Sequence, residues 1–128
     1  MDFAFSEDQE SIRELARKIL LDRVTHDRLK QVEATPEWFD RETWQELASA
    51  NLLGVAVDEK HGGMGMGFLE LCILLVEVGR TVAPVPVWPS LLLGALPIAR
   101  FGTPAQKEHY LPRMPRGECI LTSALLEP

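Results

Sequence analysis

Apolar residues recur along the first part of the chain at the spacing of a helix. After Ser6 they fall at i, i+3, i+4, i+7 and i+8, which forms one stripe of an amphipathic helix (Ile12, Leu15, Ala16, Ile19, Leu20). Ser6 with Gln9 three residues later matches the capping-box pattern, which predicts where this helix begins. Residues 25–37 are polar and weakly patterned, so we expect only part of that stretch to be helical.

A second helix is predicted from Asp40, a residue type favoured at the N-cap, to Gly54, a residue type favoured just beyond a helix. Its inner face is apolar (Trp44, Leu47, Ala48, Leu52). The short apolar run 55–57 is predicted to be extended, and residues 58–67 contain four glycines and are predicted to be a loop.

A third helix is predicted from Phe68 to Arg80, with an apolar face that we expect to be buried (Phe68, Leu71, Cys72, Leu75, Val76). Glu77 lies three residues before Arg80, a spacing that predicts a surface or interface ion pair. A later helix is predicted to begin at the Thr103–Gln106 capping box and to end by Pro112.

Between these helices, the 19 residues 81–99 contain no charged side chain. That length raises the question of a membrane span. Four prolines in the stretch disfavour a regular helix across it, and we predict a buried hinge followed by a core helix (Pro84, Pro86, Pro89, Pro97). We expect this helix to start near Pro89, to kink or split in two at Pro97, and to end at Gly102. Residues 82–96 fit either a core or the wall of an apolar pocket, and the pattern alone leaves both open.

Composition and charge narrow the possible partners. The net charge is -6, and 46% of residues are apolar, as in ordinary globular proteins. The chain has no basic patch, so we do not expect it to bind nucleic acid. Cys72 and Cys119 suit a reducing compartment, and Met1 leads almost directly into a helix, so we expect a cytoplasmic protein. The histidines and cysteines have no metal-ligand spacing, and no metal site is predicted.

Near the end of the chain, residues 119–126 form a continuous apolar run, which predicts a buried strand. A strand needs a partner for its backbone groups, and the remaining sequence offers none. We therefore expect the chain to be part of a longer protein. The glycine loop 58–67 lacks the features of a phosphate-binding loop, and a structural role is favoured.

Several of these landmarks together resemble the acyl-CoA dehydrogenase family. Residues 53–65, LGVAVDEKHGGMG, are similar to its "GLxGxxxPEEYGGxG" run, and residues 77–80, EVGR, to its "EELxR". Residues 101–112, FGTPAQKEHYLP, resemble "GTxxQKxxYLP", and Gly117 with Glu118 matches the "GE" that follows. Residues 124–128, ALLEP, resemble its "ALTEP". The matches come in the family's order over nearly the whole chain.

The resemblance implies an all-α fold, an orthogonal bundle of about five to six helices over residues 1–117. Residues 118–128 would then begin the family's middle β-domain, with this strand as its first. It implies an FAD-dependent enzyme that dehydrogenates an acyl-CoA thioester between Cα and Cβ and passes electrons to an electron-transfer flavoprotein. The catalytic base would lie in the family's last domain, so no catalytic residue is assigned in this chain.

By the same resemblance, Leu125 and Leu126 occupy the flavin-contacting positions "LT", where Leu126 replaces a threonine and offers no hydroxyl. The family's acyl-binding helix corresponds to a stretch that contains four candidate pocket residues (Trp88, Pro89, Leu92, Leu93). Leu126 also raises an alternative, a flavin-poor partner subunit of a hetero-oligomeric dehydrogenase. Two further hypotheses are a stand-alone helical interaction module and a relative with oxidase or hydroxylase chemistry. The acyl group, and whether the oligomer is a homomer or a heteromer, stay open.

Overall fold

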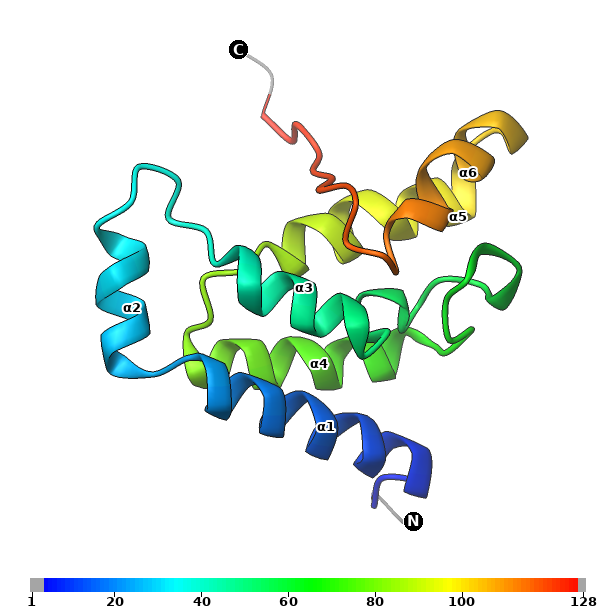
Figure 1. The fold of residues 1–128 in the computed structure, drawn as a ribbon. Helices are drawn as coiled ribbons and strands as arrows, with labels where there is room; N and C mark the ends of the chain where they lie inside the picture. The colour runs from blue at the N-terminus through cyan, green and yellow to red at the C-terminus, as the bar shows by residue number, and fades with distance from the viewer. Residues whose placement is uncertain (1–3, 127–128) are drawn as a thin grey trace.

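The structure is a computed structural model that describes residues 4–126, and the helices within this range form an all-α fold (Figure 1). The prediction of an all-α domain is confirmed, and no β-strand is formed among the described residues. The α-helices are α1 (Glu7–Arg23), α2 (His26–Glu33), α3 (Arg41–Ser49), α4 (Phe68–Thr81), α5 (Leu96–Phe101) and α6 (Pro104–Tyr110). Short 3-10 turns and one π-helix complete the fold, namely η1 (Leu52–Gly54), η2 (Glu59–His61), η3 (Trp88–Ala95, π) and η4 (Leu111–Arg113).

The helix starts agree with the caps predicted from the sequence. In α1 the Gln9 N–H donates to Ser6 Oγ (3.3 Å) and the Ser6 N–H donates to Gln9 Oε1 (3.0 Å). The same reciprocal pair joins Thr103 and Gln106 at the start of α6, at 2.8 and 3.3 Å. Such pairs satisfy backbone donors that a helix start otherwise leaves unbonded.

Helix α1 packs against α3 and α4, and the three helices enclose much of the hydrophobic core (Figure 1). The largest buried side chain is Trp44 of α3, 2% exposed, whose indole N–H donates to the carbonyl of Gly117 (3.0 Å). The core residues come from all parts of the fold (Ile12, Ala16, Leu20, Trp44, Leu47, Leu52, Leu53, Val55, Val57, Leu71, Ile73, Leu74, Val87, Leu91, Ala95, Leu111, Met114).

The end of α3 and the segment after it differ from the prediction. The helix ends at Ser49 rather than at Gly54, because Asn51 adopts a left-handed conformation (φ 57°) that stops helical propagation. Residues 55–57 form turns rather than an extended run. Their packing is buried, and carbonyls of this turn accept hydrogen bonds from the backbone of residues 64–66 in the glycine loop. Tertiary pairing therefore decides the local conformation.

The buried face of α4 is also rotated from the predicted one. Phe68 and Val76 are more than half exposed, and the buried positions are Leu71, Ile73, Leu74 and Glu77. Glu77 forms the expected ion pair with Arg80 (3.6 Å), but its carboxylate is 2% exposed and also bonds Arg17 of α1 (3.1 Å). Of the two predicted alternatives, a surface or an interface pair, the structure has the pair at the interface between α1 and α4, because α1 covers the side of α4 that carries Glu77.

The apolar stretch after α4 forms a helix that runs from Trp88 through Phe101 without a break, first as η3 and then as α5. In η3 the Leu96 N–H donates to the Leu91 carbonyl, five residues back, which is π-helical bonding. Pro97 has no N–H, and in an α-helix its ring would clash with the carbonyl four residues back. The change from π to α winding falls at Leu96, next to Pro97, where a kink or a split in two was predicted. Among the described residues, no helix is long and apolar enough to cross a membrane.

Residues 118–126 follow as a segment without regular secondary structure (red in Figure 1). The buried strand predicted for residues 119–126 is not formed within the described chain, and Leu125 and Leu126 are 71% and 93% exposed. A strand needs a hydrogen-bonding partner strand, and the described residues contain none. That this segment begins a β-domain stays a prediction. The last two residues of the predicted stretch 118–128, residues 127 and 128, lie outside the described range.

Candidate functional site

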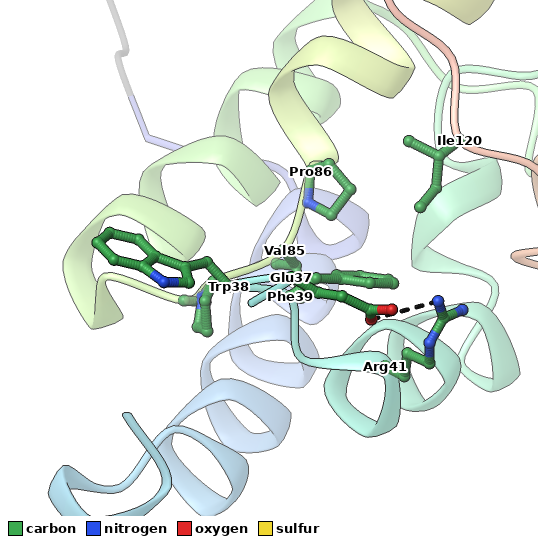
Figure 2. A pocket seen from close by; sticks show the side chains of 9 residues that line it. Glu37, Trp38, Phe39, Arg41, Val85, Pro86 and Ile120 are labelled. Carbon is green, nitrogen blue, oxygen red and sulfur yellow. Dashed lines mark hydrogen bonds and ion pairs between the residues drawn. The ribbon is translucent and has the colours of Figure 1, made fainter. Parts of the chain in front are cut away.

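An open apolar groove of about 630 Å³ lies where two loops of the helical domain meet (Figure 2). One loop, residues 37–41, leads into α3, and the other, residues 83–86, connects α4 to η3. Ile120 of the segment after η4 closes a third side. Most of the lining is aromatic, aliphatic or proline (Trp38, Phe39, Ala83, Pro84, Val85, Pro86, Ile120). Volumes of 300–1,000 Å³ with such linings are usual for sites that bind small molecules.

The two loops are joined beneath the groove at Asp40. Its backbone N–H donates to the Pro84 carbonyl (2.9 Å), which fixes the distance between the two walls. Its carboxylate accepts the backbone N–H groups of Glu42 and Thr43 at the start of α3 and the Thr43 hydroxyl (2.8 Å). Arg28 of α2 binds both carboxylate oxygens, at 2.6 and 3.0 Å. Asp40 therefore caps a helix and ties three elements together.

The charge state of this pair follows from its contacts. Burial of the Asp40 carboxyl acts to raise its pKa. The hydrogen bonds from Arg28 and Thr43 lower the pKa by more than burial raises it, and the result is a pKa of about 2. The same carboxylate raises the pKa of the Arg28 guanidinium above its ordinary value. Both groups are thus charged at neutral pH, and the pair acts as a fixed support for the groove rather than as an acid or base in it.

The rim of the groove carries one exposed ion pair and two aromatic rings. Arg41 Nη2 lies 3.4 Å from Glu37 Oε2, and its guanidinium carbon lies 5.2 Å from the centre of the Phe39 ring. Phe39 in turn meets Trp44 edge to face at 6.2 Å. Figure 2 shows Trp38 on one side of the groove and Arg41 and Ile120 on the other. Trp38 is 70% exposed and has a left-handed backbone (φ 49°), an uncommon conformation for a bulky residue.

The four residues predicted to line an acyl pocket all lie on η3. Trp88 is 51% exposed at the start of that helix, and Pro89, Leu92 and Leu93 are half-buried. None of the four lines the groove, although Pro86 of its wall stands two residues before Trp88. Their assignment to an acyl pocket stays a prediction.

Leu125 and Leu126 lie at the exposed end of the C-terminal segment. Within the described residues, their backbone N–H and C=O groups form no hydrogen bond. Free backbone groups on an extended segment fit the role that the resemblance assigns them, which is contact with the ring of FAD through the main chain. The side chains fit only apolar contact, since neither carries a donor or acceptor.

Two other candidate chemistries find no support in the described residues. The backbone N–H groups of residues 64–66 donate to the carbonyls of Gly54, Val57 and Val55, so these amides are not free to hold a phosphate. A side chain at Gly63 would meet the Val57 carbonyl, which explains a glycine at this position by close packing. In the part of the chain that the structure describes, no group of three or more histidine, cysteine or acidic side chains is arranged so that it could hold a metal ion.

The sequence pattern missed the groove because its walls come from segments that are far apart in the chain. Residues 25–37 were weakly patterned, and Trp38 and Phe39 were not singled out. One signal was available. Two adjacent aromatic residues directly before the Asp40 cap lie outside any helical stripe, and exposed aromatic side chains are frequent at binding surfaces.

Comparison with known proteins gives a consistent family. The model of the acyl-CoA dehydrogenase N-terminal domain matches residues 6–118. Acyl-CoA dehydrogenase FadE27 of Mycobacterium tuberculosis is 34% identical over 98% of this chain, and the alignment covers 34% of that protein. The chain therefore spans about a third of the length of this relative.

Solved structures agree with the sequence relatives. A variant of the Tcur3481-Tcur3483 steroid ACAD superposes with a TM-score of 0.87 at 47% identity, over 91% of this chain and 32% of that one. The ChsE4-ChsE5 complex of Mycobacterium tuberculosis gives a TM-score of 0.89 at 34% identity, over 95% of this chain and 34% of that one.

Proposed function

Because this chain belongs to the acyl-CoA dehydrogenase family and carries its N-terminal domain, we propose that it is the N-terminal part of an FAD-dependent acyl-CoA dehydrogenase subunit. The observation that carries the proposal is the family match over residues 6–118, together with 47% identity to a steroid ACAD. The reaction is dehydrogenation of an acyl-CoA thioester between Cα and Cβ. FAD would supply the hydride-accepting chemistry, with Leu125 and Leu126 of this chain proposed to contact it, and the base for the α-proton would come from outside this chain.

We further propose that the acyl group is bulky and polycyclic and that the enzyme is built from two unlike subunits. Two of the solved structures that this chain is similar to bear paired names, and one of them is called a complex. Leu126, where the family has threonine, supports a subunit whose flavin contacts are completed by a partner chain. Electron-transfer flavoprotein is the proposed acceptor. The free thiols Cys72 and Cys119 support a cytoplasmic location.

In this proposal the groove of Figure 2 provides apolar surface for the end of the acyl group that is remote from the thioester. Trp38, Pro84 and Pro86 offer flat, rigid faces, which a fused-ring system can cover with little loss of side-chain entropy. The pair of Arg41 and Glu37 supplies polar groups at the rim for an oxygen substituent. The predicted residues on η3, which begin two residues after Pro86 of the groove wall, are proposed as a further apolar part of the acyl site.

The test uses the full-length subunit purified with any subunit that copurifies. We expect a flavin absorption band, which a CoA thioester of a steroid side chain bleaches under anaerobic conditions more readily than a straight-chain thioester does. A preparation with no flavin in any subunit combination would overturn the proposal. Equal bleaching by both thioesters would keep the dehydrogenase and remove the polycyclic substrate.

Matched aromatic variants test the groove itself. Trp38→Ala is expected to raise KM for the steroid thioester about tenfold, the effect of losing one well-packed aromatic contact. Phe68→Ala is the control, because Phe68 is also exposed, at 52%, but lies at the opposite end of α4 from the groove. That helix has 14 residues, so its two ends are about 20 Å apart. Equal KM values in both variants would remove the groove from the substrate site.

A further inference from the structure

The segment after η4 lies on the helical domain in a defined register. Its side chains alternate, with residues 119, 121 and 123 half-buried and residues 120, 122 and 124 exposed. A period of two is the signature of an extended chain with one face against a surface. The Leu121 N–H donates to Ser90 Oγ of η3 (3.3 Å), and Ser90 is completely buried.

One turn further along η3, Gly94 is the point of closest approach. A Cβ placed on Gly94 would lie 2.3 Å from Leu121 Cβ and 3.3 and 3.4 Å from the Leu121 carbonyl carbon and Cα. The first distance is a clash, and the other two involve backbone that a side-chain rotation cannot relieve. Glycine inside a helix is destabilising relative to alanine, so a close approach of this kind is a physical reason for its presence.

The π-helical winding belongs to the same feature. The buried residues of η3 are Ser90, Leu91, Gly94 and Ala95. Ser90 and Gly94 face the segment after η4, while Leu91 and Ala95 face the hydrophobic core. Single stretches of π-helix are uncommon and are frequently found at functional sites.

We propose that Ser90 and Gly94 are positioning residues, and that together they form a notch that fixes the register of residues 119–126 on the helical domain. The Ser90 hydroxyl accepts the Leu121 amide, and the bare Gly94 backbone receives the Leu121 side chain. A slip of one residue would turn every side chain of the segment to its opposite face. The notch thereby sets where Leu125 and Leu126 are presented, and only this last step rests on the function proposed above.

The test compares glycine variants in the full-length subunit, purified with its partner. Gly94→Ala is expected to lower hydrogen-exchange protection of the Leu121 amide about tenfold or more, because the segment must move outward. Gly79→Ala is the matched control. Gly79 also lies in a helix, and a Cβ there has no atom within 4 Å. Equal protection of the Leu121 amide in both variants would overturn the proposal.

Two further variants keep the test decisive if Gly94→Ala folds poorly. Ser90→Ala removes only the acceptor for the Leu121 amide, and we expect a loss of protection of a few-fold. Leu121→Gly combined with Gly94→Ala removes the clashing Cβ but keeps the contacts of the Leu121 carbonyl carbon and Cα, so protection of the segment should recover in part relative to Gly94→Ala alone. No loss in Ser90→Ala together with no recovery in the double variant would refute the notch.

The positioning role has its own readout. With the notch disrupted, the flavin absorption maximum and the rate of FAD release should change, while Gly79→Ala leaves both unchanged. If exchange at Leu121 responds but both flavin properties stay constant, the positioning role is wrong and the contact is structural only. If the wild-type protein holds no flavin, the proposed function fails, while the exchange measurements still decide whether the notch exists.

Discussion

The helical region from α1 to α4 differs from the stretch between η3 and residue 126 in how its charged side chains are paired. The first region pairs its inward-facing charges, as in Glu77 with Arg17 and Asp40 with Arg28. The second region has no buried ion pair among the described residues. It exposes several large apolar side chains (Trp88 51%, Phe101 85%, Ile120 49%, Leu125 71%, Leu126 93%), as α1 and α4 also do at Leu21, Phe68 and Val76.

This difference assigns different roles to the two regions of the domain, stability to the first and binding to the second. Paired charges and caps fix how the first three packed helices meet, so that region has the contacts of a finished core. Exposed apolar side chains occur in both regions, but those of the second region lie on η3, α5 and the C-terminal segment beside the groove, and such patches mark interaction surfaces in globular proteins. We therefore expect substitutions in the first region to change stability and substitutions in the second to change binding.

The largest effect is expected at Trp44, which joins the two regions. Trp44→Ala removes a large core side chain and the hydrogen bond to the Gly117 carbonyl, and should lower the free energy of unfolding by about 4 kcal/mol. Urea denaturation followed by circular dichroism measures it. Trp38→Ala, at a 70% exposed position, should change the free energy by less than about 0.5 kcal/mol. Similar losses in both variants would contradict the division between core and binding surface.

The next effect compares two carboxylates that both pair with arginine in the first region. Asp40→Ala should cost about 3 kcal/mol, because it removes a buried ion pair and a helix cap at once. Glu46→Ala breaks the exposed pair with Arg23 (2.8 Å) and should cost less than about 1 kcal/mol. Thermal and urea unfolding of the two variants check the ratio, and equal costs would show that burial does not govern the strength of these pairs.

The same carboxylate predicts how stability depends on acid. The pKa of Asp40 is about 2 in the folded chain, below its ordinary value of 3.8, so the folded state favours the ionised form. Its contribution is complete above about pH 4 and is lost as the pH falls toward 2, which amounts to about 2 kcal/mol. Urea midpoints measured across this range should fall more steeply for the wild type than for Asp40→Asn. Parallel curves would contradict the assignment.

In the second region, we expect a titrating group to make stability depend on pH at the alkaline end of the scale. Burial raises the pKa of the Cys119 thiol above its ordinary value of 9.0. The unfolded chain then releases this proton at a lower pH than the folded chain does, so stability should decline as the pH rises above 9. Cys119→Ser should flatten that decline and leave the acid limb unchanged. An unchanged alkaline limb would show that this thiol has the same pKa in both states.

How much could be predicted from the sequence depended on the range of the interaction. The caps at Ser6 and Thr103 were predicted because all their partners lie within three residues. The burial of Glu77 was not, because its partner Arg17 lies 60 residues away. Pro97 alone does not predict the π-helix, because a proline at that position can also kink or end a helix. The groove also needed the Asp40 N–H to bond the Pro84 carbonyl, which no local pattern contains.

The smallest expected effect isolates one long-range hydrogen bond between otherwise identical caps. Gln9 and Gln106 each complete a capping box with nearly the same distances. Gln9 alone also donates its Nε2–H to Glu70 Oε1 (2.8 Å), which links the starts of α1 and α4, and this bond is the first cause of the lowered pKa of Glu70. Gln9→Ala should therefore cost about 1 kcal/mol more than Gln106→Ala, the usual value of one such bond.

A double-mutant cycle decides whether that excess belongs to the bond. In a Glu70→Ala background the Gln9→Ala substitution retains only its capping loss, so its cost should fall to that of Gln106→Ala. If the excess persists without Glu70, it comes from the position of the cap in the first region and not from the contact across it. Equal costs for the two glutamines in the wild-type background would mean that the link between α1 and α4 adds nothing, and that the apolar core alone holds those helices together.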